Sequence, residues 1–88
     1  MTYTVVLVRE EVGGYSVHVP ALPGCQTQGE TVPEAIDMAK EAIECYLGSL
    51  EKRGRPLPQD VQSVTFDWED GVEALVYRVP VRDVAPVA

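Results

Sequence analysis

The stretch HVPALPGCQTQGETVPEA, residues 18–35, contains three prolines, two glycines and the single histidine of the chain. Pro20 ends a preceding strand, because proline cannot donate a hydrogen bond to a continuing ladder. Pro23 and Gly24 form a turn signature, in which proline presets φ and glycine can adopt a positive φ. Leu22 is an apolar residue inside this turn, and we expect it to pack back onto the core. The stretch is therefore interpreted first as scaffold.

A helix start closes this stretch. Thr31 can cap the first backbone N–H groups, and Glu34 three residues later completes a capping box. Pro33 lies in the first turn, where its missing N–H is not needed. A helix is predicted over residues 31–53, with Gly54 as its C-terminal glycine. Apolar residues recur at helical spacing and indicate a buried stripe: Ala35, Ile36, Ala39, Ala42, Ile43, Tyr46, Leu47 and Leu50.

Three strands are predicted before the helix. Residues 3–9 are rich in β-branched side chains with little polar interruption, which favours a strand buried on both faces. Residues 15–19 alternate apolar and polar side chains, and the glycines between the two runs predict a β-hairpin. Residues 25–28 can form a short third strand, closed by Gly29.

Two more strands are predicted after the helix. Residues 55–60 contain two prolines and predict an extended connector. Strands are predicted at 61–66 and 72–79, with a hairpin turn at 68–71 between them. We expect the later strand to lie at the sheet edge and the tail, residues 83–88, to fray.

The order β-β-β-α-β-β predicts an α+β fold of two layers, in which one long helix covers a mostly antiparallel sheet. At 88 residues the chain has room for one core, so residues 1–88 are interpreted as a single domain. No apolar run is long enough to cross a membrane, and the N-terminus lacks the features of a signal peptide. We therefore expect a cytoplasmic protein with no membrane association.

The chain is acidic: 7 Lys and Arg stand against 14 Asp and Glu, a net charge of −7. A field of this sign repels phosphate, so we expect no direct binding of nucleic acid. The charge suits a basic protein partner, although solubility alone explains it equally well. One histidine and two separated cysteines offer no metal-ligand spacing. We expect neither a metal nor another cofactor.

Few residues could support catalysis. Ser16 and His18 are two apart on one predicted strand and share a face, and Cys25 follows a turn glycine. No orienting third group and no glycine-built oxyanion hole accompany them. Cys45, inside the predicted helix, is interpreted as a small core or boundary residue. We predict that the chain is not an enzyme. A catalytic function resting on these side chains is the weakest of three hypotheses, and the other two, both binding functions, are given below.

The ordered positions on either side of the turn resemble the HicB-like antitoxin family. The family's signature is a strand ending in proline, a Leu-Pro-Gly-Cys turn, and a Gly-acid-Thr step into a helix that begins Glu-Ala. The resemblance covers about residues 3–50. Its signature positions here are Pro20, Leu22, Pro23, Gly24, Cys25, Gly29, Glu30, Thr31, Glu34 and Ala35.

The resemblance implies a truncated ribonuclease-H-like β-β-β-α-β fold. It implies no nuclease activity, because the first strand reads Thr4 to Val8 where that chemistry needs acids. It also implies a partner of the HicA type, a small, basic, RNA-cleaving toxin resembling a double-stranded-RNA-binding domain, silenced by burial of its active site. Full members carry a C-terminal DNA-binding module. No second helical segment follows residue 54, so we expect no operator binding.

Two groups of acidic residues are candidates for contact with such a toxin. They are Asp37, Glu41 and Glu44 on the predicted helix and Asp67, Glu69 and Asp70 at the predicted turn. A solvated surface explains either group equally well. Trp68 is the strongest single candidate, because aromatic anchors dominate interface energies. The alternative to an antitoxin is a stand-alone domain without a toxin, which forms homo-oligomers by pairing the exposed edges of its small sheet.

Overall fold

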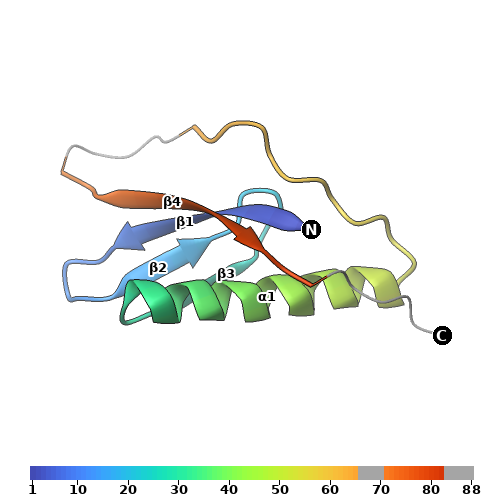
Figure 1. Ribbon diagram of the computed structural model, residues 1–88, viewed down its shortest axis with the longest axis horizontal. Coiled ribbons are helices and arrows are strands. Elements are labelled where there is room, and N and C mark those ends of the chain that lie inside the picture. Colours follow the sequence, from blue (N-terminus) through green and yellow to red (C-terminus); the bar gives the residue numbers. More distant parts are fainter. Residues whose placement is uncertain (66–70, 83–88) are drawn as a thin grey trace.

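The computed structural model describes residues 1–65 and 71–82. Its elements are β1 (Thr2–Arg9), β2 (Tyr15–His18), β3 (Gln26–Gly29), α1 (Val32–Lys52) and β4 (Ala74–Pro80). The strands form one four-stranded sheet in the order β3-β2-β1-β4, and each neighbouring pair is antiparallel. α1 runs along one face of this sheet (Figure 1). The predicted two-layer α+β fold is confirmed.

The core lies between α1 and the sheet. Val5, Leu7 and Val17 point from β1 and β2 toward the helix and are fully buried. The helix contributes a stripe of buried residues one turn apart, as its apolar spacing predicts. The stripe consists of Ala35, Ala39, Ile43 and Leu47.

α1 starts at the cap that the sequence predicts. Thr31 has an extended backbone, and its Oγ1 accepts a hydrogen bond from the Glu34 backbone N–H at 3.2 Å. At the other end Arg53 is the C-cap, and Gly54 has a φ of +68°, in the region that favours glycine. The helix therefore lies one residue inside the predicted range at each end.

β1 is the central strand of the sheet and is buried on both faces, as predicted. On the face away from α1, Thr4 and Val6 are only 4 % and 2 % exposed. The antiparallel register places Val6 between His18 on β2 and Val76 on β4. Pairing on both sides and cover on both faces together explain the run of β-branched residues in this strand.

Residues 55–65, called the strap from here on, connect α1 to the segment before β4. Leu57 packs against the core, and residues 61–64 pass over the outer face of β1 and β4. The Asp60 carboxylate accepts hydrogen bonds from the backbone N–H and the hydroxyl of Thr4, both at 2.8 Å. The Tyr3 hydroxyl donates to the Pro58 carbonyl. Burial raises the pKa of Tyr3, and the nearby Asp60 carboxylate adds to this shift.

The register of the sheet explains why Thr4 needs a partner outside it. Val6 pairs with His18, the last residue of β2, so Thr4 would stand opposite Pro20, where the chain has turned away. A buried backbone N–H without an acceptor is costly. Asp60 supplies that acceptor from the strap.

The predicted strand at 61–66 is wrong over residues 61–65, which the structure describes without strand pairing. Asp60 accepts hydrogen bonds from the backbone N–H and the hydroxyl of Thr4, and the residues after it pass over the outer face of the sheet instead of joining its edge. The predicted strand at 72–79 is confirmed as β4, which lies at the sheet edge as expected. The hairpin turn predicted at 68–71 falls almost wholly outside the described residues, and the predicted fraying of 83–88 falls entirely outside them.

Candidate partner-binding surface

The turn between β2 and β3 is closed by its own backbone. The Leu22 N–H donates to the Val19 carbonyl at 3.0 Å, and the Cys25 N–H donates to the Leu22 carbonyl at 2.9 Å. The Val19 N–H donates in return to the Cys25 carbonyl at 3.2 Å. Gly24 has a φ of +82°, which glycine adopts without strain. Leu22 is fully buried, as its apolar character inside a turn predicts.

Gly29, at the end of β3, allows the helix to approach the sheet closely. A Cβ on Gly29 would lie 2.6 Å from both the backbone nitrogen and the Cα of Ala35, too close for any real side chain. Farther along the helix, the Tyr46 hydroxyl donates to the Pro23 carbonyl at 3.0 Å. Residues 20–35, called the signature corner from here on, thus make structural contacts between β2, β3 and α1.

The Ser16 and His18 side chains share the outer face of β2, where Ser16 Oγ lies 3.4 Å from His18 Nε2. Within residues 1–65 and 71–82, no carboxylate is hydrogen-bonded to His18 to orient its ring. Nucleophile–base pairs in enzymes are typically oriented by such a third group. The pair has the geometry of neighbouring polar residues on a half-buried strand.

The two cysteines have different environments. Cys25 lines a hollow of about 200 Å³ together with His18, but its side chain is buried. Burial raises the pKa of the Cys25 thiol, and the nearby Cys45 adds to the shift, so the nucleophilic thiolate is disfavoured. Cys45 is exposed, which corrects the expectation of a core or boundary residue. It is two positions from the buried Ile43 and Leu47, on the opposite side of the helix.

The acidic candidates on α1 differ in what they contact. Asp37 and Glu41 lie about one turn apart and are exposed. Glu44 is held within the chain: its Oε1 accepts from the Arg82 guanidinium at 3.1 Å, and its Oε2 accepts from the Arg82 backbone N–H at 3.4 Å. These bonds from Arg82 hold the pKa of Glu44 below its usual range. Glu44 therefore anchors Arg82, which follows β4, to α1.

The other predicted contact residues, Asp67, Trp68, Glu69 and Asp70, lie outside the described residues. Their role in partner binding stays a prediction. Glu73, the next acid in the chain, is described: its carboxylate lies 3.8 Å from the Arg9 guanidinium, at the exposed end of the β1–β4 pair.

The fold brings together two acids that the sequence does not single out as a pair. Glu10, after β1, and Glu30, after β3, line one hollow of about 340 Å³ together with Val12 and Tyr15. Val12 is 98 % exposed at the hairpin tip. The register that pairs Tyr15 with Gly29 brings these two corners together. Local sequence predicts each turn, but not their meeting.

Acidic side chains consequently gather at one end of the molecule. The β1–β2 hairpin tip and the first half of α1 lie at the same end, on the left in Figure 1. We call this region the acidic end, and it comprises Glu10, Glu30, Glu34, Asp37 and Glu41.

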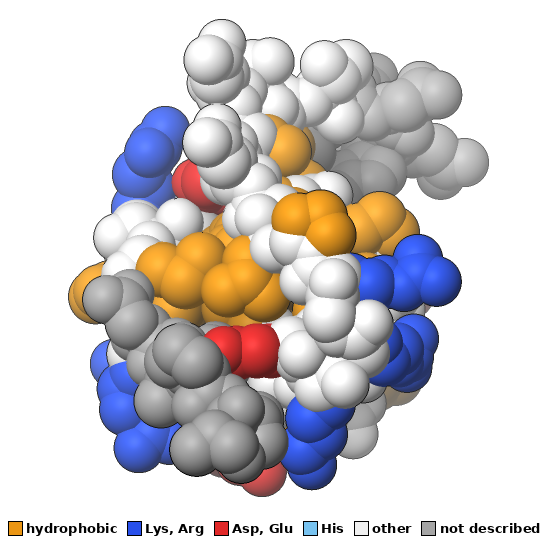
Figure 2. All heavy atoms as spheres, turned by 90° about the vertical axis from the view of Figure 1, so that its right-hand side faces the viewer, with side chains coloured by type: hydrophobic (Ala, Val, Ile, Leu, Met, Phe, Trp, Pro, Cys, Tyr) orange, Lys and Arg blue, Asp and Glu red, His pale blue; other side chains and the backbone are white. Residues whose placement is uncertain are grey.

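Basic residues are more frequent toward the opposite end, although Arg9 and Lys40 lie near the acidic end. Lys52 is in the last turn of α1, and Arg53 and Arg55 follow it. Figure 2 looks onto this end and shows Lys and Arg side chains around a band of hydrophobic side chains. The two ends of the molecule therefore differ in charge, with acidic side chains more frequent at one and basic side chains more frequent at the other.

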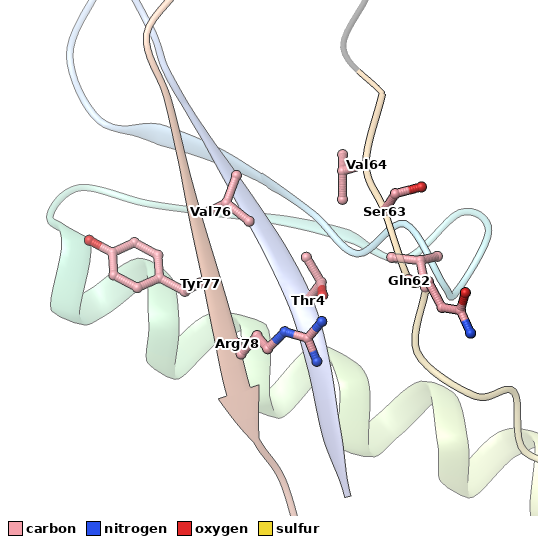
Figure 3. A pocket seen from close by; sticks show the side chains of 8 residues that line it. Thr4, Gln62, Ser63, Val64, Val76, Tyr77 and Arg78 are labelled. Atoms are coloured by element: carbon pink, nitrogen blue, oxygen red, sulfur yellow. The ribbon is translucent and has the colours of Figure 1, made fainter.

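A further hollow, of about 310 Å³, lies between the strap and the outer face of the sheet (Figure 3). It is lined by Thr4, Val61, Gln62, Ser63, Val64, Val76, Tyr77 and Arg78. Arg78 lies 3.9 Å from the Asp60 carboxylate, so its charge has a counterion in the chain. Across the described ranges, no three His, Cys, Asp or Glu side chains are grouped to hold a metal ion. The described part of the chain also lacks a helix long and apolar enough to cross a membrane.

The sequence of this fold can be compared with known families. Residues 3–85 match the family described as HicB-like antitoxin of bacterial toxin-antitoxin system. The match includes the signature corner, the strap and β4, and so extends well beyond the positions that carry the resemblance in sequence. The chain belongs to the HicB-like antitoxin family. Membership of this family favours a binding protein over an enzyme.

Curated relatives carry the same signature region. A UPF0150 protein of Thermoplasma acidophilum is 52% identical over 60 residues, which cover 68% of this chain and 87% of that protein. Antitoxin HicB 1 of Photorhabdus laumondii is 42% identical over 62 residues, which cover 66% of this chain and 40% of that protein. The HicB-like chain described here thus aligns with short proteins and with part of a longer antitoxin.

Solved structures share the HicB-like fold. A toxin–antitoxin complex from Streptococcus pneumoniae superposes with a TM-score of 0.79 at 22% identity, over 93% of this chain and 69% of that chain. The N-terminal domain of the antitoxin HicB of Burkholderia pseudomallei superposes with a TM-score of 0.67 at 25% identity, over 91% of this chain and 99% of that chain. These likenesses confirm the arrangement that the resemblance implies.

Proposed function

We propose that this HicB-like domain binds and neutralises a small, basic, RNA-cleaving toxin of the HicA type by covering its active site. The observation that carries the proposal is the family match over residues 3–85, on a fold whose acidic side chains gather at one end. A solved relative is described as a complex of HicA3 and HicB3, and its antitoxin fold superposes on this chain with a TM-score of 0.66.

Charge supports a basic partner. The net charge is −7, and the described cations lie mostly away from the acidic end. Opposite charges across an interface speed the encounter of two proteins and exclude partners of like charge. An acidic end next to exposed apolar surface such as Val12, which is 98 % exposed, suits a basic protein better than a nucleic acid.

Among the predicted contact residues, Asp37 and Glu41 are the acids that the structure leaves available on α1. Glu44 is already paired with Arg82, so its replacement is expected to loosen the chain after β4 rather than the complex. Trp68 remains the proposed apolar anchor. Replacing Trp68 by Ala should weaken the complex by about 2 kcal/mol or more, and an unchanged affinity would remove Trp68 from the interface.

Two charge-reversed variants locate the surface. Asp37→Lys with Glu41→Lys reverses the helix acids, and Glu10→Lys with Glu30→Lys reverses the hairpin acids. Each pair of changes raises the net charge by four, from −7 to −3. Because the variants match in charge, a loss of binding in one alone identifies a surface rather than a general field.

The test is purification of the tagged chain from its native host, followed by mass spectrometry of what binds in equal amount. A small basic protein that dissociates at high salt, and is lost with one charge-reversed pair, supports the proposal. Recovery of the bait alone contradicts it.

A second candidate is a stand-alone domain that self-associates without a toxin. The observation that favours it is the open edge of β4, whose outer-face side chain at Val76 is 49 % exposed. Size measurement of the purified chain tests self-association, which needs no other protein, and the capture experiment tests the toxin.

A further inference from the structure

The backbone of β4 presents an edge that no described residue pairs with. The Arg9 N–H donates to the Glu73 carbonyl, and the Val81 N–H donates to the Met1 carbonyl, so the odd-numbered residues of β4 face β1. The N–H and C=O groups of Ala74, Val76 and Arg78 therefore point away from the sheet. No backbone hydrogen bond between described residues reaches them.

The two edges of the sheet differ in how they are protected. β3, at one edge, is four residues long and carries polar Gln26, Thr27 and Gln28. β4, at the other edge, is seven residues long. Its side chains are mostly apolar, and Arg78 is its one charged residue. Short, polar or charged strands discourage pairing between molecules, and long apolar ones invite it. β4 is therefore the edge strand that favours pairing with another molecule.

Exposed apolar side chains follow the same strand. Among the described residues the large hydrophobic side chains that are exposed include Val72, Val76 and Tyr77, at 43 %, 49 % and 38 %. Figure 3 shows Val76 on the side of the strap and the Tyr77 ring on the opposite side. Apolar surface thus flanks the open edge on both faces of the sheet.

Among the described residues, no acidic side chain on β4 opposes contact between two copies at this edge. The chain has a net charge of −7, yet β4 itself contains no acidic residue. Glu73, just before it, is paired with Arg9 at 3.8 Å. Within residues 1–65 and 71–82, the side chains of the acidic end lie at the hairpin and the first half of α1, and none of them belongs to β4.

We propose that β4 pairs antiparallel with β4 of a second copy, about a two-fold axis through Val76. In this register Val76 meets Val76 of the second copy, and Ala74 meets its Arg78. Each of these pairs exchanges both backbone hydrogen bonds. The register uses all the outward N–H groups and leaves Pro80, which has none, outside the pairing. A shift toward Pro80 would lose a bond.

The proposed pairing joins both sheets into one continuous sheet. Because the axis is perpendicular to the sheet, both helices lie on the same face. Leu75 and Tyr77 of one copy then meet Tyr77 and Leu75 of the other on the helix side, where cross-strand apolar pairs stabilise a sheet. The inference gives the second candidate function its surface, and it holds whether or not a toxin binds elsewhere.

Two substitutions test the register in opposite directions. Val76→Lys places two ammonium groups face to face across the axis, and the dimer should weaken by about tenfold or more. Ala74→Glu places a carboxylate opposite Arg78 of the second copy at two symmetric positions. At low salt the dimer should become about fivefold tighter, and high salt should remove the gain.

Val12→Lys is the matched control, since it adds the same charge at the hairpin tip, where Val12 is 98 % exposed. The measurement is sedimentation equilibrium of the purified chain over a wide concentration range, with circular dichroism to show that each variant is folded. A dimer that only Val76→Lys dissociates, and that Ala74→Glu tightens, supports the proposal.

Three results would overturn it. The first is a monomer of 9.6 kDa at every concentration. The second is a dimer that Val76→Lys leaves intact, which would place the contact elsewhere on the chain. The third is a dimer whose affinity Ala74→Glu leaves unchanged, which would rule out the register centred on Val76. Capture of a toxin is measured separately, so the two proposals fail independently.

Discussion

The signature corner and the strap are held in place by contacts of different range. In the corner, the Cys25 N–H bonds to Leu22, and Thr31 caps the N–H of Glu34, each three residues along. In the strap, Asp60 bonds to Thr4 across 56 residues. The contacts that close the turn and cap the helix in the corner join near neighbours in sequence, whereas the contact that anchors the strap joins residues far apart.

This difference determines which of the two regions can vary in sequence without loss of the fold. The corner is tightly packed, and its signature residues form the turn, the helix cap and the close contact between β3 and α1. Variation there alters folding before it alters binding. The strap instead reaches the sheet through a few side-chain contacts, so it and the adjoining β4 edge can change while the corner stays intact.

The largest effect is expected for Gly29→Ala, where β3 closely approaches α1 in the signature corner. The new Cβ would meet Ala35 backbone atoms at 2.6 Å, and the fold should lose about 3 kcal/mol of unfolding free energy. Gly48→Ala is the matched control: nothing lies within 4 Å of its Cβ, and a helical alanine should stabilise by about 1 kcal/mol. Urea unfolding followed by circular dichroism measures both. Equal stability of Gly29→Ala and the unchanged chain would refute the close approach.

The next effect is expected at the anchor of the strap, in Asp60→Ala. The buried Thr4 N–H and hydroxyl lose their acceptors, and the unfolding free energy should fall by about 2 kcal/mol. Asp60→Asn keeps one acceptor oxygen and should lose less. Hydrogen exchange should accelerate at the Thr4 amide while the Cys25 amide in the corner stays protected. Equal acceleration at both sites would contradict the separation of the two regions.

A smaller effect is expected at the helix cap in the corner. Thr31→Ala removes the oxygen that accepts the Glu34 N–H and should lower the unfolding free energy by about 1 kcal/mol. Thr31→Ser keeps the oxygen and should be close to neutral. Thermal unfolding of the two variants measures the difference, and identical curves would show that the cap adds nothing.

The smallest effect is expected where the chain after β4 meets α1. The pKa of Glu44 is lowered by hydrogen bonds from Arg82, so the carboxylate stabilises the fold above its ordinary pKa of 4.5. That contribution is lost as pH falls through the lowered, folded-state pKa. The difference in unfolding free energy between the unchanged chain and Glu44→Gln should therefore be present at neutral pH and vanish in acid. A difference independent of pH would assign Glu44 another role.

Sequence reasoning predicts the regular elements because their signals are local. The alternation at 15–19, the cap at Thr31 and the apolar stripe of the helix each specify their own segment, and the structure follows them. It fails at 61–65, where β-branched residues suggest a strand, because the bonds from Thr4 to Asp60 hold this segment over the outer face of the sheet. That contact spans 56 residues, so the local sequence does not predict it.

The candidate surface is less predictable from sequence than the fold. Asp37 and Glu41 are exposed acids, as helical spacing suggests, but the pairing of Glu44 with Arg82 spans 38 residues. The meeting of Glu10 and Glu30 depends likewise on strand register. Composition predicts that the chain is acidic, whereas only the fold shows where the acids gather.

The most direct test of the antitoxin account is a titration of RNA cleavage. The basic protein that co-purifies with the chain is released by denaturant, refolded and incubated with RNA, and the purified chain is added back in steps. The account predicts that the released protein cleaves RNA and that cleavage stops at one equivalent of added chain. Recovery of the chain without a basic partner, or cleavage that continues at excess chain, would contradict it.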